Sequence, residues 1–208
     1  DIGGGTTEIA IISLGGIVVS KSLKVAGQEM DNAIVHYVRL RHGLIMGEAT
    51  AEDVKIKIGR AYERSSKVKT QKLKEEETPN PEPSTNNLRE RLAVVRGRDI
   101  ETGLPKSLRI TEVEIREALA PVLAQILEAI SDVLQEAPPE LTNDILTHGI
   151  LLTGGGSMLS GLDQLIVERT KIPVVLSEDP LTSVVRGTGK VLENDDLLQR
   201  VKVVGGLK

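Results

Sequence analysis

The chain has 208 residues, enough for one domain or two small lobes, and carries a formal net charge of −4 at pH 7. This acidic balance gives no general attraction to nucleic acid, so we expect no nucleic-acid partner. Cysteine is absent, which excludes disulfides and thiolate chemistry and is typical of a cytoplasmic protein. With two Tyr and no Phe or Trp, the core must be aliphatic.

The chain opens with a glycine-rich turn, Asp1-Ile-Gly-Gly-Gly-Thr-Thr-Glu. Glycine adopts positive φ without a Cβ penalty and lets the backbone approach another group closely. We therefore expect the N–H groups of Gly3, Gly4 and Gly5 to converge on an anion, with the hydroxyls of Thr6 and Thr7 at the rim. Asp1 is placed where a carboxylate could hold a metal-bound or attacking water. The alternative is a plain hairpin turn that needs small residues.

A hairpin and a helix are predicted after this turn. The apolar run over residues 9–14 predicts a buried strand, and Gly15-Gly16 is a two-residue hairpin signal before a returning strand over residues 17–25. Apolar residues at helical spacing from Met30 predict a helix that ends near Gly43.

A second helix is predicted from Thr50, which resembles an N-cap with Asp53 three residues later, and it continues toward Gly59. Within this helix, Glu52 and Lys55 are three positions apart and share one face. From spacing alone, that pair is either part of a binding surface or a surface ion pair.

Residues 63–90 differ in composition from the rest of the chain. A lysine-rich stretch is followed by three consecutive glutamates, three prolines and a run of polar residues. With few apolar groups to offset the entropy of ordering, this segment is expected to be a disordered insertion. The alternative is a charged tail that binds a partner.

Two strands and a long helix are predicted next. The strands, at residues 92–95 and 107–110, flank a turn that contains Gly103. Thr111 and Glu114 have the spacing of a capping box, and a broad apolar stripe follows them until the helix ends at Pro138-Pro139.

A second glycine turn comes late in the chain. An apolar strand over residues 150–153 leads into Gly154-Gly155-Gly156-Ser157, and a helical pattern follows. A strand, glycine turn and helix N-terminus place backbone N–H groups against a phosphate or ribose. Two such turns in one chain favour a nucleotide held between them. The rest alternates helix (160–170), strand (172–176) and helix (181–193), which is typical of an α/β sheet covered by helices.

Four motifs together resemble the MreB family of rod-shape-determining bacterial actins. They are residues 1–8, Gly47-Glu-Ala-Thr-Ala-Glu52, Leu152-Thr-Gly-Gly-Gly-Ser157, and Ile172-Pro-Val-Val with Glu178-Asp-Pro-Leu181. The glycine motifs belong to the wider superfamily of actins, chaperone ATPases and sugar kinases, whereas the other two point more narrowly to MreB. The likeness covers most of the chain except about residues 63–92. Because the family begins with another half that carries its own phosphate loop, this chain resembles the second half only.

The resemblance implies an α/β fold with an actin-like (ribonuclease-H-like) ATPase lobe at residues 1–28 and 116–208. A smaller inserted α+β lobe would occupy residues 29–115. It also implies ATP and Mg²⁺ as cofactors of a slow ATPase, of which this half alone would hydrolyse ATP poorly.

The same resemblance implies roles for particular residues. Asp1 would be the catalytic residue and the Mg²⁺ ligand, because the matching family residue positions the metal and the attacking water. The nucleotide would be bound by residues of both glycine turns and of the second helix, namely Gly4, Gly5, Thr6, Glu52, Asp53, Val54, Lys55, Gly154, Gly155, Gly156 and Ser157.

The full protein would be cytoplasmic and would assemble with itself into membrane-associated filaments. Those filaments would direct the cell-wall synthesis and elongation machinery and maintain a rod shape. Three alternatives stay open: a chaperone ATPase, a sugar kinase, and a non-catalytic interaction module that keeps the fold without turning over nucleotide.

Overall fold

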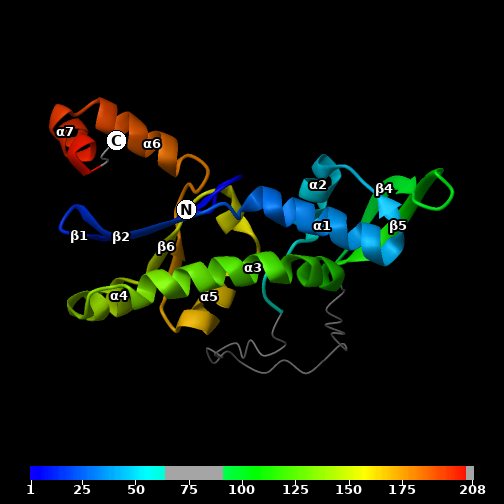
Figure 1. The fold of residues 1–208 in the computed structure, drawn as a ribbon, viewed down its shortest axis with the longest axis horizontal. Coiled ribbons are helices and arrows are strands. Elements are labelled where there is room, and N and C mark those ends of the chain that lie inside the picture. The colour runs from blue at the N-terminus through cyan, green and yellow to red at the C-terminus, as the bar shows by residue number, and fades with distance from the viewer. Residues whose placement is uncertain (64–90, 205–208) are drawn as a thin grey trace, which may run out of the picture.

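The computed structural model describes residues 1–63 and 91–204, with side chains described up to residue 199. The expected disordered insertion therefore lies almost entirely outside the described residues. Within them the chain is a mixed α/β structure (Figure 1), which agrees with the expected fold class. In chain order its elements are β1 (Thr7–Ser13), β2 (Gly16–Leu23), α1 (Gly27–His42), β3 (Leu44–Ile45), α2 (Glu48–Ile58), β4 (Leu92–Asp99), β5 (Pro105–Thr111), α3 (Glu112–Gln135), the 3-10 helix η1 (Pro139–Leu141), α4 (Thr142–His148), β6 (Ile150–Leu152), the 3-10 helix η2 (Gly155–Met158), α5 (Leu162–Thr170), β7 (Val174–Leu176), α6 (Ser183–Leu192) and α7 (Asp195–Val204).

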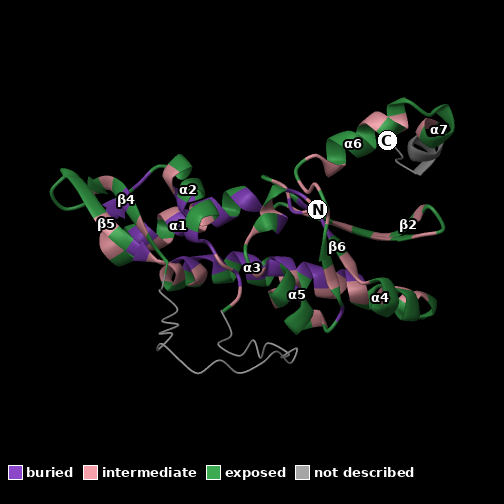
Figure 2. Ribbon diagram, turned by 180° about the vertical axis from the view of Figure 1, so that it is seen from behind, coloured by how far each residue is buried: buried purple, intermediate pink, exposed green. Residues whose placement is uncertain are grey.

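The core lies along α1 and α3, which contact each other and carry many of the buried residues (Figure 2). Helix α3 begins as the sequence predicts, at a capping box. The Thr111 hydroxyl accepts a hydrogen bond from the Glu114 N–H at 3.2 Å, and the Glu114 carboxylate accepts one from the Thr111 N–H at 2.9 Å. The apolar stripe beyond it is fully buried at Leu119 and Ile126. This stripe gives the aliphatic core that the composition requires.

Helix α2 begins earlier than the sequence predicts. Gly47, not Thr50, is the N-cap, and Thr50 lies inside the first turn. The N–H groups of Thr50 and Ala51 donate to the Gly47 carbonyl oxygen at 3.0 and 3.2 Å, so the helical hydrogen bonds already start there. The expected cap at Thr50 is therefore wrong. It failed because Glu48, which favours the positive N-terminal end of a helix, can occupy the first turn without a side-chain cap.

The β1–β2 hairpin turns one residue earlier than expected. Ser13 pairs with Gly16, so Leu14 and Gly15 form the turn, with φ of 50° and 77°. A two-residue turn of this hand needs positive φ at both central positions. Gly16 is therefore the first residue of β2 and not part of the turn.

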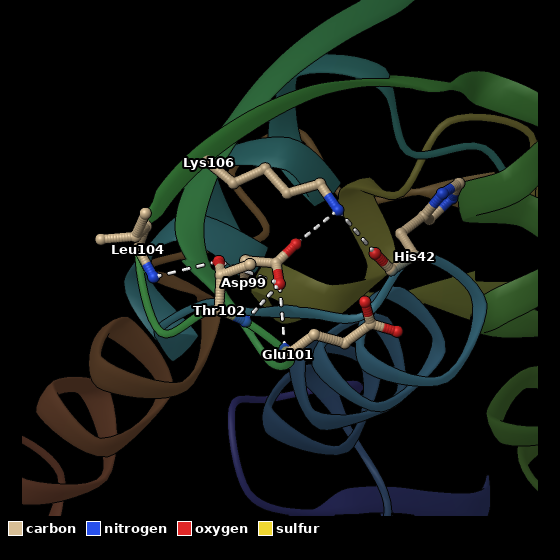
Figure 3. A network of polar contacts seen from close by, with 6 residues as sticks. All are labelled: His42, Asp99, Glu101, Thr102, Leu104 and Lys106. Atoms are coloured by element: carbon tan, nitrogen blue, oxygen red, sulfur yellow. Dashed lines mark hydrogen bonds and ion pairs between the residues drawn. The ribbon is translucent and has the colours of Figure 1, made fainter.

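The β4–β5 turn is stabilised by a network around one aspartate (Figure 3). The Asp99 carboxylate accepts hydrogen bonds from the backbone N–H groups of Glu101 and Thr102 at 2.9 and 3.0 Å and from the Lys106 ammonium at 2.7 Å. Lys106, followed by the Thr102 N–H, lowers the pKa of Asp99 to about 2. Lys106 also donates to the carbonyl oxygen of His42 at 3.4 Å, which links this turn to the end of α1.

The last third confirms the predicted alternation with β6, α5, β7 and α6, and β6 pairs with β7 in parallel. Two helices were not predicted: α4, which lies between Pro139 and Gly149, and α7. In the described part of the chain, no helix combines the length and apolar character needed to cross a membrane. The division into two lobes stays a prediction.

Candidate functional site

A cavity of about 890 Å³ lies where the two glycine turns meet helices α1 and α2. This volume is within the range of small-molecule binding sites. Its wall includes Gly3, Gly4 and Gly5 of the first turn, Gly155 and Gly156 of the second, Gly27, Gln28 and Asp31 of α1, Glu48, Glu52 and Lys55 of α2, and Arg91.

The two glycine turns are joined to each other through Ile2. The Ile2 N–H donates to the Thr153 carbonyl oxygen, and the Gly156 N–H donates to the Ile2 carbonyl oxygen, both at 2.8 Å. Gly154 has φ of 85°, and a Cβ there would lie 2.4 Å from the Ile2 oxygen. The second turn therefore requires glycine at position 154 both for its conformation and for the close approach of Ile2.

The first glycine turn is also bonded to the start of α1. The N–H groups of Gly27 and Gln28 donate to the carbonyl oxygens of Gly3 and Gly4 at 3.1 and 2.7 Å. A Cβ at Gly4 or Gly5 would meet nothing within 4 Å, because both residues face open space at the cavity. This turn is thus fixed from one side and accessible from the other.

Helix α2 contributes Glu52 and Lys55, the two charged residues that were predicted to share one face. Glu52 and Lys55 line the cavity. The Lys55 ammonium donates to Asp31 at 2.8 Å and to the Gly27 carbonyl oxygen at 2.9 Å. Burial raises the pKa of Asp31, Lys55 opposes that effect, and the charges of Glu52 and Glu48 add to it.

The structure brings six of the expected ligand-binding residues to the cavity wall and leaves five outside it. Asp53 forms an exposed ion pair with Lys57 at 2.9 Å, whereas Val54 is buried in the core. Ser157 is also buried, and its hydroxyl donates to the Gly154 carbonyl oxygen at 2.6 Å. At the wall are Gly4, Gly5, Glu52, Lys55, Gly155 and Gly156, and outside it are Thr6, Asp53, Val54, Gly154 and Ser157.

Asp1 does not line the cavity. Its carbonyl oxygen accepts from the Glu8 N–H at 2.8 Å. One carboxylate oxygen, Oδ2, is buried without a hydrogen-bond partner among the described residues, which is uncommon for a buried polar atom. The described residues contain no group of three or more His, Cys, Asp or Glu arranged to hold a metal. A metal at Asp1 therefore stays a prediction.

Asp31 is the charged cavity-lining residue that the sequence least clearly indicated. It lies beside Met30 on the buried face of α1 and is only 8% exposed. A charged residue is rarely buried without a partner. The position of Asp31 within an apolar helical stripe could therefore have indicated a buried ion pair. Its partner, Lys55, lies on another helix, so the sequence did not reveal the pair.

The fold and the glycine turns together define a protein of the actin-like class. A crystal structure of MreB5 from Spiroplasma citri bound to AMPPNP superposes with a TM-score of 0.79 at 34% identity, covering 97% of this chain and 53% of that one. A MamK double helical filament, at 24% identity, shares the fold with a TM-score of 0.68 over 93% of this chain and 53% of that one. The chain belongs to the MreB/Mbl protein family, whose profile matches residues 1–78 and 81–200.

Two curated relatives show how much of the family this chain represents. It is 45% identical over 197 residues to the cell shape-determining protein MreB of Escherichia coli (strain K12), covering 95% of this chain and 50% of that protein. It is 40% identical over 203 residues to the cell shape-determining protein Mbl of Bacillus subtilis (strain 168), covering 98% of this chain and 54% of that protein. The chain thus spans about half the length of these relatives. Family membership decides against the chaperone ATPase and sugar kinase alternatives.

Proposed function

We propose that this chain supplies the second half of an ATP-binding, filament-forming bacterial actin that acts in cell-shape determination. The observation that carries the proposal is the cavity between the two joined glycine turns and α2. Family membership supports it, as do the structures of Spiroplasma citri MreB5, which is about one-third identical to this chain and was solved with AMPPNP and with ADP.

In this proposal, the chemistry of the cavity wall decides which end of ATP lies where. Backbone N–H groups at Gly5 and Gly155 would donate hydrogen bonds to phosphate oxygens, because glycine lets the backbone approach an anion closely. Glu48 and Glu52 repel phosphate but accept hydrogen bonds, so the α2 wall suits the ribose hydroxyls and the base. Lys55, three positions after Glu52 on the same wall, adds one positively charged donor.

Asp1 is the proposed ligand of Mg²⁺ and the residue that orients the attacking water. Mg²⁺ is commonly held by one or two carboxylates together with substrate phosphates, and Oδ2 of Asp1, which has no hydrogen-bond partner in residues 1–63 and 91–204, would suit such a role. The whole protein would then be a slow ATPase. Its partners would be further copies of itself and the cell-wall synthesis machinery at the membrane.

Calorimetric titration of the whole protein with AMPPNP, with this chain as its second half, tests the proposal. We expect saturable binding, weakened about tenfold or more by Gly5→Val and by Gly155→Val, since each adds a side chain where a phosphate must approach the backbone. Gly189→Val is a matched control, because position 189 lies on α6 outside the cavity and is open to a side chain. Absence of AMPPNP binding would favour the non-catalytic interaction module. In the whole protein, ATP-dependent light scattering tests for filaments.

A further inference from the structure

Asp31 of α1 and Lys55 of α2 form an ion pair in the cavity wall, with side chains 12% and 13% exposed. We infer that Asp31 is a positioning residue of the nucleotide site: it holds the Lys55 ammonium in one place and so presents the remaining ammonium donor to the ligand. The inference rests on the proposed function, because it concerns the same cavity.

The contacts of Lys55 account for two of its three donors. One N–H is directed to Asp31 Oδ2 at 2.8 Å and another to the Gly27 carbonyl oxygen at 2.9 Å. An ammonium has three donors and no acceptor, so one is left for a ligand. A lysine side chain is otherwise a flexible four-carbon stem, and the two contacts remove that freedom before a ligand arrives.

The pair also ties the two walls of the cavity together. Gly27, which accepts from Lys55, donates its own N–H to the carbonyl oxygen of Gly3 in the first glycine turn. A chain of hydrogen bonds thus runs from α2 through the start of α1 to that turn. The position of Lys55 is therefore defined relative to the place where phosphates are proposed to bind.

Asp31 is better suited to this role than the neighbouring acids. Glu48 and Glu52 also line the cavity, but both are exposed, and neither contacts Lys55 among the described hydrogen bonds. Asp31 is buried, and its second oxygen, Oδ1, has no partner in the described part of the chain. Lys55 is consequently the one described side chain that compensates the buried carboxylate, which strongly favours the paired geometry.

Acylation of lysine amines, quantified by mass spectrometry at each site, tests the position of Lys55 without any ligand. In the unsubstituted chain, Lys55 should react more slowly than exposed Lys57 on the same helix. Asp31→Asn should speed acylation of Lys55 by about tenfold, the scale of losing one coupled contact, and leave Lys57 unchanged. Asp132→Asn is the matched control, because Asp132 pairs with Lys21 at 2.6 Å away from the cavity. Equal reaction of Lys55 in the Asp31→Asn and unsubstituted chains would overturn the inference.

Binding of AMPPNP then tests whether that position matters. Asp31→Asn should weaken binding by about tenfold in the unsubstituted background but less than about twofold when Lys55→Met is already present, because the aspartate acts through the lysine. An equal loss in both backgrounds, or a fall in melting temperature with unchanged affinity, would assign Asp31 a purely structural role and overturn the inference. These titrations use the whole protein; if its unsubstituted form binds no AMPPNP, the proposed function itself fails, and the inference fails with it.

Discussion

Gly156 donates its backbone N–H to the carbonyl oxygen of Ile2 at 2.8 Å, although about 150 residues separate them in the chain. Ile2 is 2% exposed, and a Cβ at Gly156 would lie 2.5 Å from its side chain. The two glycine turns therefore form one packed unit and not two independent loops. Among these glycines, Gly154 is required by the packing against Ile2, Gly4 and Gly5 face open space at the cavity, and Gly156 both packs against Ile2 and lines the cavity.

These different surroundings predict unequal effects of two substitutions on the free energy of unfolding. Gly154→Ala should lower the free energy of unfolding by about 1–3 kcal/mol, because the new Cβ overlaps the Ile2 backbone and the residue has positive φ. Gly5→Ala should change it by no more than about 0.5 kcal/mol, since nothing lies near the added methyl group. Urea denaturation followed by circular dichroism measures both. Equal effects would contradict the packing described for Ile2.

The capping box of α3 predicts a second measurable cost. Thr111→Ala should lower the free energy of unfolding by about 1 kcal/mol, because the Glu114 N–H loses its acceptor at the helix start. Thr111→Ser retains the hydroxyl and should recover most of that loss. If the serine and alanine variants were equally destabilised in urea denaturation, the cap hydrogen bond would not be the cause.

Tyr37 should titrate well above an ordinary tyrosine. Burial, followed by the hydrogen bond to Glu117 at 2.7 Å, raises the pKa of Tyr37 to about 12. Since the pKa is higher in the folded chain than in the unfolded chain, the contribution to stability is present below pH 10 and is lost as the pH rises through about 12. The ultraviolet absorbance of tyrosinate in a Tyr62→Phe chain isolates Tyr37. Glu117→Gln should lower its pKa, and an unchanged titration curve would argue against the Glu117 contact.

Asp99 gives the opposite pH dependence. Its pKa is lowered to about 2, chiefly by Lys106, so its contribution to stability is present above the ordinary value of 3.8 and is lost as the pH falls through about 2. Carboxyl-carbon NMR should show Asp99 titrating higher in Lys106→Met than in the unsubstituted chain. Glu101→Gln is a suitable control, because only its backbone N–H contacts Asp99. An unchanged Asp99 titration in Lys106→Met would show that the backbone N–H groups alone lower the pKa.

Features of the fold that depend only on residues close together in the sequence could be predicted. The cap at Thr111 and the end of α1 at Gly43, which adopts a left-handed conformation, are of this kind. The start of α2 was missed because a threonine with an acid three residues later is common inside helices as well as at caps. The two-residue length of the first hairpin turn was predicted correctly. The position of the turn was not, because it depends on which pair of residues closes it.

The candidate site was predictable only in part, for a related reason. Both glycine turns could be located, because a run of glycines beside an apolar strand is visible in the sequence and suits the close approach of an anion. The direction of each neighbouring side chain could not, since packing turns Val54 and Ser157 inward while Lys55 faces the cavity. The pairing of Lys55 with Asp31 depends on how two helices approach each other, which helical periodicity does not specify.

The union of the two turns at Ile2 also has a kinetic consequence. Helix α3 starts from a local capping box, whereas the hydrogen bond from Gly156 to Ile2 closes a loop of about 150 residues. Closing so long a loop carries an entropy cost, and contacts between distant residues slow folding. During refolding, helix content should therefore recover before the cavity exists, and capture of a ligand would mark the last step of the pathway.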